Sequence, residues 1–339
     1  MKDIKGQLLL IFIFFFVSFI YSCTGNNPKN IVTPNPPGGN TDIIKDVAYA
    51  VVTDWQGNKI TLGMDIYSPA KGEQDQKYPL VMHLHGGGYN DGDKSTAADK
   101  CLILADSGFI AVSVNYRLGW MSGSDTNPCD GDTLSFNDAA YRAIQDANAA
   151  LRFLVSKANE LSIDTNWIFL SGASAGATVI LGSAYIDDSY AAKRYPLAAA
   201  KLGSLYISGN NLKTSYKIKG IGAIAGALPD SNLINSDRAY PAITFQGEED
   251  MVIPIDHGTF MNCPNYSTFY GSLCQYRQLT ALNKSAIANF LPNEGHGDNG
   301  EAGFTDAFLM GNTACFFHNL MQSEVKKNII LIGTQYSCD

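Results

Sequence analysis

The chain has 339 residues, of which 45% are hydrophobic, and its formal net charge is −8 at pH 7. A chain of this length can bury a large core, and residues 43–339 suit one α/β domain of roughly 300 residues. The acidic balance excludes a nucleic-acid partner from the expected functions, because phosphate binding needs a basic surface stripe that the sequence does not contain.

The first 42 residues predict an export signal and a tether. Leu8–Tyr21 is an apolar run interrupted only by Ser18, and two lysines precede it. The run is too short to span a bilayer as a stable helix, so residues 1–22 are expected to be a signal peptide. Residues 23–42 are rich in Pro, Gly and Asn, as flexible linkers are. The domain that follows is therefore expected outside the cytoplasm, in the periplasm or at the cell surface.

Cys23 lies where the apolar run stops. The sequence Ile20-Tyr21-Ser22-Cys23 resembles the lipobox of bacterial lipoproteins and departs from it at Tyr21. This resemblance implies a lipid anchor at Cys23 as the means of membrane attachment. An ordinary secretory signal with an incidental cysteine is the alternative.

Short apolar runs alternate with helix-like segments after the tether. This alternation predicts an α/β fold with a mainly parallel, eight-stranded sheet and helices on both faces. The first two runs are joined by Asp54-Trp55-Gln56-Gly57-Asn58, a hairpin signal, and would form an antiparallel edge. The strands are expected at residues 47–53, 59–66, 78–84, 109–114, 168–173, 219–228, 242–245 and 286–291.

Helices are expected between these strands. The longest would begin at Ser135, because Asp138 follows at the spacing of a capping box. Residues 187–218 are either a small cap over the site or an extended helix and loop, and we favour the second. The remaining helical segments are expected at residues 95–106, after residue 174, at 270–282 and at 304–321, with an apolar, helix-like tail to residue 339.

The motif Gly172-Ala173-Ser174-Ala175-Gly176 follows an apolar run and precedes a helix-like segment. It predicts a sharp turn from strand to helix with Ser174 at the bend. The two glycines suit such a turn, because strand and helix backbones approach each other too closely for a Cβ. Ser174 is therefore a candidate nucleophile.

Six cysteines remain after Cys23, an even number in a chain expected to be exported, and this predicts disulfides. The sequence does not choose among the possible pairings. We favour the neighbours Cys263–Cys274 and Cys315–Cys338, which leaves Cys101–Cys129. Since the sequence has no C-x-x-C unit and no cluster of histidines, we expect neither a metal nor a cofactor.

Five histidines compete for the role of catalytic base. His83 lies inside a predicted strand, and His85 begins a glycine loop whose conformation it would fix. His257 and His318 lie in or near helix-like sequence and are expected to be structural. His296, which glycines flank in a loop after the last strand, is the remaining candidate.

These motifs resemble the α/β-hydrolase superfamily, in particular the esterase group of hormone-sensitive-lipase-like enzymes and type-B carboxylesterases. The resemblance covers about Val47 to His318 and rests on the order Ser…Asp…His, on G-x-S-x-G and on the upstream His85-Gly86-Gly87-Gly88. The segment Asn115-Tyr116-Arg117-Leu118 is also similar to carboxylesterases. Ala173 departs from the pattern, because many members carry Glu or Asp before the serine.

The resemblance implies a role for each candidate residue. It makes Ser174 the nucleophile and His296 the base. Asp250 would be the acid, since Gly247-x-x-Asp250 followed by Val252 and Pro254 looks like the acid loop of many α/β hydrolases; Glu249 is the alternative. The oxyanion hole would consist of the backbone N–H groups of Gly87, Gly88 and Ala175.

The function that follows is a serine carboxylic ester hydrolase acting through an acyl-serine intermediate. Its substrate would be a small-molecule or glycan-linked ester, with a short acyl or aryl group such as acetyl or feruloyl. A serine peptidase or amidase, and a catalytically silent binding module at the cell surface, are the alternatives. The substrate pocket is expected to be shaped by residues 89–94, 120–134 and 187–218.

Overall fold

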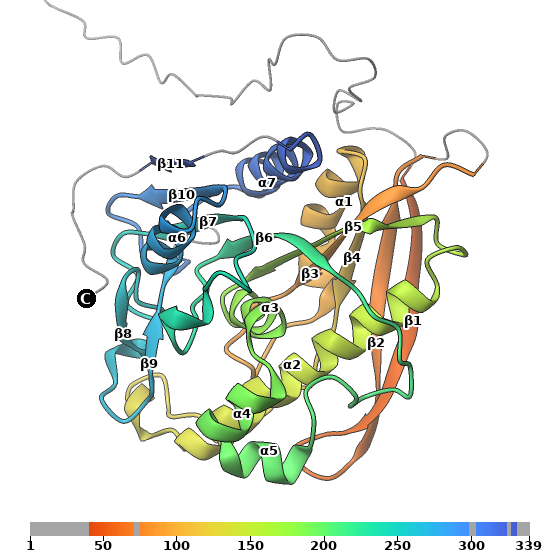
Figure 1. The fold of residues 1–339 in the computed structure, drawn as a ribbon. Helices are drawn as coiled ribbons and strands as arrows, with labels where there is room; N and C mark the ends of the chain where they lie inside the picture. The colour runs from red at the N-terminus through yellow and green to blue at the C-terminus, as the bar shows by residue number, and fades with distance from the viewer. Residues whose placement is uncertain (1–40, 71–74, 298–302, 324–326, 331–339) are drawn as a thin grey trace, which may run out of the picture. The chain divides into compact units, whose positions relative to one another are not determined.

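The computed structural model describes residues 41–70, 75–297, 303–323 and 327–330 (Figure 1). The predicted signal peptide, Cys23 and most of the predicted tether lie outside these residues. Among the helices that the structure describes, none combines the length and the apolar character needed to cross a membrane.

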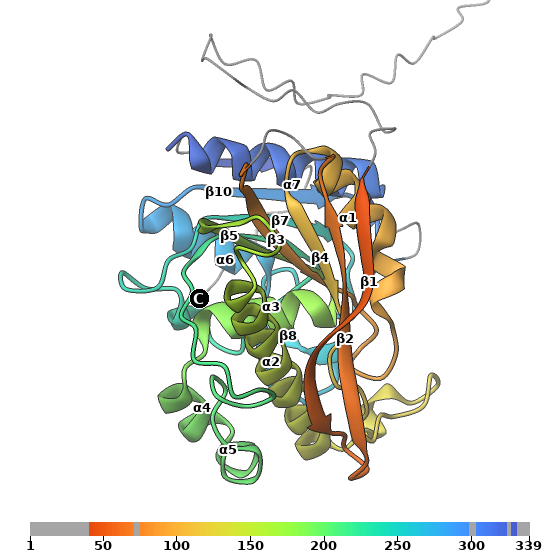
Figure 2. The same cartoon turned by 90° about the vertical axis from the view of Figure 1, so that its right-hand side faces the viewer.

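Nine of the described strands form one sheet, in the order β1-β2-β4-β3-β5-β6-β7-β10-β11. β1 is antiparallel to β2 and β2 to β4, and every later neighbour is parallel. Figure 2 shows β1 and β2 as long strands side by side at one edge. The strands are β1 (Asp42–Thr53), β2 (Lys59–Ser68), β3 (Tyr78–Leu84), β4 (Ile110–Val114), β5 (Ile163–Ala173), β6 (Ile218–Ile224), β7 (Ala242–Gly247), β10 (Ala286–Leu291) and β11 (Lys327–Ile330).

The eight predicted strands and the antiparallel edge are confirmed. β11 is a ninth strand, in a stretch that the sequence predicts as helix-like tail. It pairs in parallel with β10 at the edge of the sheet. A short apolar run does not distinguish strand from helix by its periodicity, and here the open edge of β10 supplies hydrogen-bonding partners for a strand.

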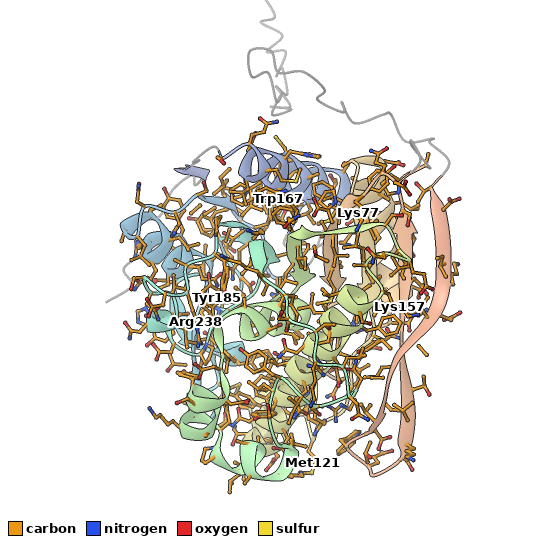
Figure 3. All side chains as sticks on the ribbon, turned by 45° about the vertical axis from the view of Figure 1, so that its right-hand side comes forward. Lys77, Met121, Lys157, Trp167, Tyr185 and Arg238 are labelled. Atoms are coloured by element: carbon orange, nitrogen blue, oxygen red, sulfur yellow. A yellow bond between two sulfur atoms is a disulfide. The ribbon has the colours of Figure 1, made fainter. Side chains whose placement is uncertain are left out.

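Helices cover both faces of the sheet, as the sequence predicts (Figures 1 and 2). On one face, α1 (Ala98–Asp106) and α7 (Asp306–Met321) pack against each other and against a core that includes Phe109 and Phe169. On the other face, α2 (Thr133–Ser156) and α3 (Ala175–Tyr185) belong to a larger core. Side chains fill the space between helices and sheet (Figure 3), so the sheet is a rigid support for the loops at its strand ends.

The start of α2 differs from the prediction. Asp132 is its N-cap, and the Asp132 carboxylate accepts a hydrogen bond from the Ser135 N–H at 2.6 Å. The side chain of Asp138, predicted to complete a capping box, instead binds the Lys201 ammonium at 2.7 Å. A carboxylate just before the helix is a strong acceptor for the unpaired N–H groups of the first turn, so the helix begins two residues earlier.

Residues 187–218 form two short helices and an irregular segment. These are α4 (Asp188–Arg194) and α5 (Pro196–Leu202). They lie against α2, where the Tyr141 hydroxyl donates to the Gly203 carbonyl at 2.7 Å. This arrangement matches the interpretation that we favoured for residues 187–218, helix and loop, over a small cap.

One disulfide, Cys129–Cys263, joins positions 134 residues apart in sequence. The predicted pairs Cys263–Cys274 and Cys101–Cys129 are therefore wrong, and Cys101 is a buried free thiol. Cys338, the predicted partner of Cys315, lies outside the described residues. The segment around Cys263 is brought to Cys129 by tertiary contacts, among them a 2.8 Å hydrogen bond from Asn265 to the Cys129 carbonyl. Pairing cysteines that are neighbours in the sequence therefore failed to predict that Cys129 and Cys263 meet.

Candidate active site

The backbone at Ser174 is strained. Ser174 joins the end of β5 to the start of α3 with φ 51° and ψ −118°, in a region that residues other than glycine rarely adopt. Hydrogen bonds hold it from both sides: its N–H donates to Ile224 at 2.8 Å, and its carbonyl accepts from Thr178 at 3.0 Å. The turn therefore projects the Ser174 side chain out of the strand and over the end of the sheet.

The two glycines of the motif are required by close approaches between backbones. A Cβ at Gly176 would lie 2.3 Å from the carbonyl oxygens of Leu84 and His85, at the end of β3. A Cβ at Gly172 would lie 2.8 Å from the backbone of Gly176. Both distances are far below van der Waals contact, so the turn depends on the absence of side chains at these positions.

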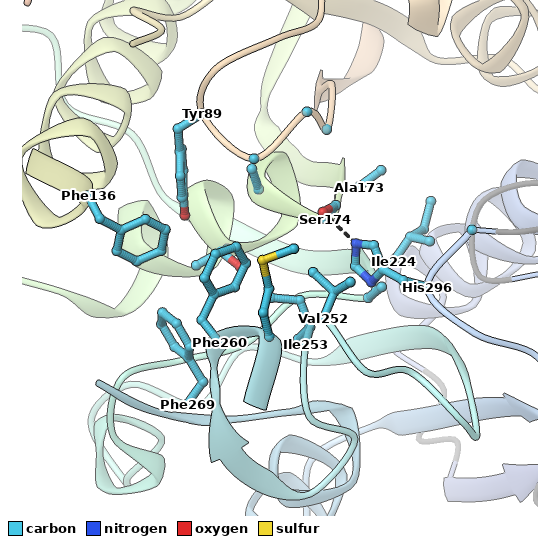
Figure 4. Close-up of a pocket in the computed structure, with 18 of the residues that line it drawn as sticks. Tyr89, Phe136, Ala173, Ser174, Ile224, Val252, Ile253, Phe260, Phe269 and His296 are labelled. Carbon is cyan, nitrogen blue, oxygen red and sulfur yellow. Dashed lines mark hydrogen bonds between the residues drawn. The ribbon is translucent and has the colours of Figure 1, made fainter. Parts of the chain in front are cut away.

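The structure brings Ser174, His296 and Asp250 together. Figure 4 shows the hydrogen bond between Ser174 and His296. The Ser174 Oγ lies 2.7 Å from the His296 Nε2, and the His296 Nδ1 lies 2.8 Å from the Asp250 Oδ2. A carboxylate only accepts hydrogen bonds, so the Nδ1 carries the proton in the neutral ring and the Nε2 is an acceptor for the serine hydroxyl. This arrangement can remove a proton from the hydroxyl.

Asp250 is held in place by four donors. Its side chain is fully buried, and its Oδ1 accepts from the N–H groups of Val252 and Ile253, each at 2.9 Å. Its Oδ2 accepts from Gln246 Nε2 at 3.1 Å as well as from His296. Glu249, the alternative acid, is exposed. The structure thus places Asp250, and not Glu249, against His296.

Gln246 is a positioning residue that the sequence analysis missed. Its side chain is fully buried near the end of β7 and donates both to Asp250 and to the Ile253 carbonyl, the latter at 2.8 Å. A polar residue near the end of an otherwise apolar strand was the signal that could have revealed it, because a buried amide needs hydrogen-bonding partners.

The glycine loop after β3 lies on the same cavity as Ser174. Gly87 and Gly88 have φ values of 106° and 58°, and a Cβ at Gly87 would lie 2.0 Å from the Asp91 carbonyl oxygen. In the part of the chain that the structure describes, no backbone hydrogen bond outside helices and strands has the N–H of Gly87, Gly88 or Ala175 as its donor. Ala175 is the first residue of α3, so its N–H has no partner within the helix. The predicted oxyanion donors therefore have N–H groups that a substrate oxygen could use.

Two neighbouring side chains support the glycine loop. The Tyr116 ring stacks on His85 at a centroid distance of 4.5 Å, and its hydroxyl donates to the His85 carbonyl at 2.9 Å. The next residue, Arg117, forms a buried ion pair with Asp146 at 2.8 Å. The Asn115-Tyr116-Arg117-Leu118 segment thus ties the loop to α2.

The other four histidines lie away from the serine hydroxyl. Burial lowers the pKa of His83 to about 3 and also lowers the pKa of His85, so both rings are neutral at pH 7. His318 on α7 contacts the Ser107 carbonyl at 2.9 Å. His257 begins a strand, β8 (His257–Thr259), and not a helix-like segment as predicted.

The cavity at Ser174 has a volume of ≈ 540 Å³. Of the three segments predicted to shape it, only the first contributes to its lining, through Tyr89. The remaining wall comes from several elements. It includes Phe136 on α2, Thr178 on α3, Ile224 at the end of β6, and part of residues 252–269, a segment that contains β8, the turn Phe260–Asn262 and β9 (Thr268–Tyr270). Residues 120–134 and 187–218 contribute nothing to the lining of this cavity, whereas Tyr195 and Leu205 line a second, smaller cavity beside it. The hairpin after the acid loop folds back over the site, and the Cys129–Cys263 disulfide ties it to the loop before α2.

Within the ranges that the structure describes, no three His, Cys, Asp or Glu side chains are grouped so that they could hold a metal ion.

Solved structures with a similar fold include two esterases. The apo form of Thermogutta terrifontis esterase 2 superposes with a TM-score of 0.54 at 16% identity, over 86% of this chain and 96% of that chain. An inhibited esterase B from Lactobacillus rhamnosis superposes with a TM-score of 0.54 at 18% identity, over 84% and 88%. This chain has the α/β-hydrolase fold. The predicted α/β-hydrolase fold is confirmed.

Part of the sequence is similar to parts of several esterases. The BD-FAE family model matches residues 64–191, which contain the glycine loop and Ser174. Gut esterase 1 of Caenorhabditis elegans is 30% identical over 164 residues, which are 46% of this chain and 27% of that protein. Esterase LipI of Mycobacterium tuberculosis is 31% identical over 121 residues, 35% of this chain and 32% of that protein. The matched region thus spans about a third or less of each relative.

We predict that Gly176→Ala destabilises the protein. The new methyl group would meet two backbone carbonyls at 2.3 Å, so the end of β3 or the start of α3 must move. Such overpacking costs about 1–3 kcal/mol, which urea unfolding followed by circular dichroism would measure.

Gly311→Ala is the matched control, because Gly311 lies within α7, is exposed, and has no atom within 4 Å of the point where a Cβ would lie. There the substitution should stabilise the protein by up to about 1 kcal/mol through helix propensity. Equal unfolding midpoints for the two variants would contradict the close approach at Gly176.

Proposed function

We propose that this α/β hydrolase is a serine carboxylic ester hydrolase. The observation that carries the proposal is the unbroken chain of hydrogen bonds from Ser174 through His296 to the buried Asp250, at a cavity that also contains the glycine loop. The similarity to carboxylesterases supports an ester as the substrate.

In the proposed acylation step, His296 Nε2 takes the hydroxyl proton while the Ser174 Oγ forms a bond to the ester carbonyl carbon. The carbonyl oxygen becomes an oxyanion, which the N–H groups of Gly87, Gly88 and Ala175 stabilise. Removing one such donor typically costs about 3–4 kcal/mol of transition-state stabilisation. His296 then gives its proton to the leaving alkoxide, and an acyl-serine remains.

In the second step His296 takes a proton from a water molecule, whose oxygen attacks the acyl-serine carbonyl. The bond to the Ser174 Oγ breaks, His296 returns the proton to Ser174, and the carboxylic acid leaves. Asp250 stays ionised throughout and holds the ring of His296 in the productive orientation.

The proposed substrates are esters with a short acyl or aryl group, including acetyl or feruloyl groups linked to carbohydrate. The aromatic side chains of the cavity support an apolar group on one side of the ester bond. The same triad supports amide hydrolysis, so a peptidase or amidase is the alternative enzyme, and a silent binding module is the alternative without catalysis.

Ser174→Ala should abolish hydrolysis of p-nitrophenyl acetate, with a loss of at least about 10⁴-fold in kcat, because the variant lacks the hydroxyl that forms the acyl intermediate. A fluorophosphonate probe should label the wild-type protein at Ser174 and leave the variant unlabelled. Wild-type protein that gains no adduct and releases no p-nitrophenol would support a silent binding module.

Asp250→Asn should lower kcat about 10⁴-fold with little change in KM, because an amide at this position favours the wrong tautomer of His296. Glu249→Gln is the matched control: it makes the same chemical change one residue away at an exposed position and should retain wild-type kcat. A larger loss in Glu249→Gln than in Asp250→Asn would assign the acid to Glu249.

We also propose that the protein is exported and anchored by lipid at Cys23, on the basis of residues 1–23 alone. In a bacterial host the mature protein should sediment with membranes, and its intact mass should lack residues 1–22 and include a lipid on Cys23. Cys23→Ala should abolish the lipid addition. A wild-type protein found in the soluble fraction without lipid would support an ordinary secretory signal.

A further inference from the structure

One end of the Ser174 cavity is closed by a cluster of aromatic side chains. Figure 4 shows these rings gathered on one side of the cavity, away from the Ser174–His296 hydrogen bond. All are at least nine-tenths buried. The cluster consists of Tyr89, Phe136, Phe260 and Phe269.

A second, smaller apolar cavity of ≈ 30 Å³ lies beyond this cluster. Its far wall comes from α2 and from the segment after α3, including Ile144, Ile186 and Leu205. The two cavities share four lining residues: Tyr89, Phe136, Thr178 and Phe269. These shared side chains are therefore the partition between the two cavities.

Phe136 is at the centre of this partition. Its ring centroid lies 5.0 Å from that of Phe260, 5.5 Å from that of Tyr89 and 6.4 Å from that of Phe269. Tyr89 follows the glycine loop, and Thr178 lies on α3 close to the serine turn. Phe136 is carried by the first turn of α2 instead, so it contributes to the partition without belonging to either loop.

We propose that Phe136 is a specificity-determining residue that sets the length of the apolar group accepted by the site. This inference rests on the proposed ester hydrolase function. The group would be a short aliphatic chain or a single aromatic ring, with its far end against the Phe136 ring. It belongs either to the acid or to the alcohol of the ester, and the two have the same chemistry at this end of the cavity.

The expected size of the effect follows from apolar burial. Each methylene group that enters an apolar pocket improves binding by about four-fold. In the wild-type protein this gain should stop at the chain length that reaches Phe136. Removing the ring joins the two cavities, so the gain should continue for several more methylene groups.

The test measures kcat/KM for two series of esters with wild-type protein, Phe136→Ala and Phe136→Leu. One series varies the acyl group of p-nitrophenyl esters from acetate to decanoate, and the other varies the alcohol of acetate esters over the same lengths. Phe136→Ala should raise the ratio of octyl to two-carbon substrates at least about ten-fold in one series, and that series identifies which part of the ester lies against Phe136. Phe136→Leu preserves more of the packing and should shift the preference in the same direction by less.

Phe109→Leu is the matched control for loss of a buried ring. Phe109 is fully buried in the core on the opposite face of the sheet, where its ring packs against Phe169 and Phe317. This variant should lose stability and keep the wild-type chain-length preference. An equal shift in Phe109→Leu would show that general loosening, and not the partition, controls chain length.

An unchanged length preference in both Phe136 variants, with acetate hydrolysis retained, would overturn this inference and leave the proposed function intact. If the wild-type protein hydrolyses no ester, the proposed function fails. The partition is then tested by binding: the dissociation constants of Ser174→Ala for uncleaved p-nitrophenyl acetate and octanoate should diverge at least about ten-fold when Phe136→Ala is added. Unchanged constants would overturn the partition on their own.

Discussion

The candidate active site of this protein depends on one close approach, between the backbone at Gly176 and the carbonyl oxygens at the end of β3. The approach allows the chain to turn from β5 into α3 within one residue. Ser174 occupies that residue in a strained conformation, and hydrogen bonds to Ile224 and Thr178 keep it there. The same contact brings the glycine loop beside the start of α3. The proposed nucleophile and the proposed oxyanion donors are thus positioned by one packing constraint.

Groups from distant parts of the chain meet at this turn because neighbouring strands of the sheet are parallel. The loops after β3, β5, β7 and β10 all follow the carboxyl ends of parallel strands, at the same end of the sheet. These loops contain the glycine loop, Ser174, Asp250 and His296. Burial and four donors fix the Asp250 carboxylate, which in turn orients the ring of His296. The polar part of the site is therefore preorganised by the rigid sheet, and it belongs to the fold as a whole.

The apolar part of the site has a different origin. Much of its wall comes from Tyr89 after the glycine loop, from Phe136 on α2 and from the hairpin of β8 and β9, which lies outside the main sheet. The Cys129–Cys263 disulfide and the hydrogen bond from Asn265 connect that hairpin to the loop before α2. Changes in these segments can therefore alter the shape of the proposed substrate pocket, while the strand ends that hold Ser174 and His296 stay the same.

The sequence by itself determined the eight predicted strands, the turn at Ser174 and the residues that meet there, because each depends on a local pattern: apolar runs, glycine spacing, or a polar residue just after a strand. The spacing Gly247-x-x-Asp250 favoured Asp250 over Glu249 by resemblance to known acid loops, and burial of Asp250 supplies the physical reason. Only the tertiary structure decided the disulfide, the support from Gln246, the cap at Asp132 and the aromatic partition around Phe136. The disulfide and the partition arise where segments far apart in the chain come into contact, and no local pattern encodes such contacts. The cap at Asp132 and the contact of Gln246 with Asp250 are local in sequence, but the partners that Asp138 and Gln246 meet are visible only in the folded chain.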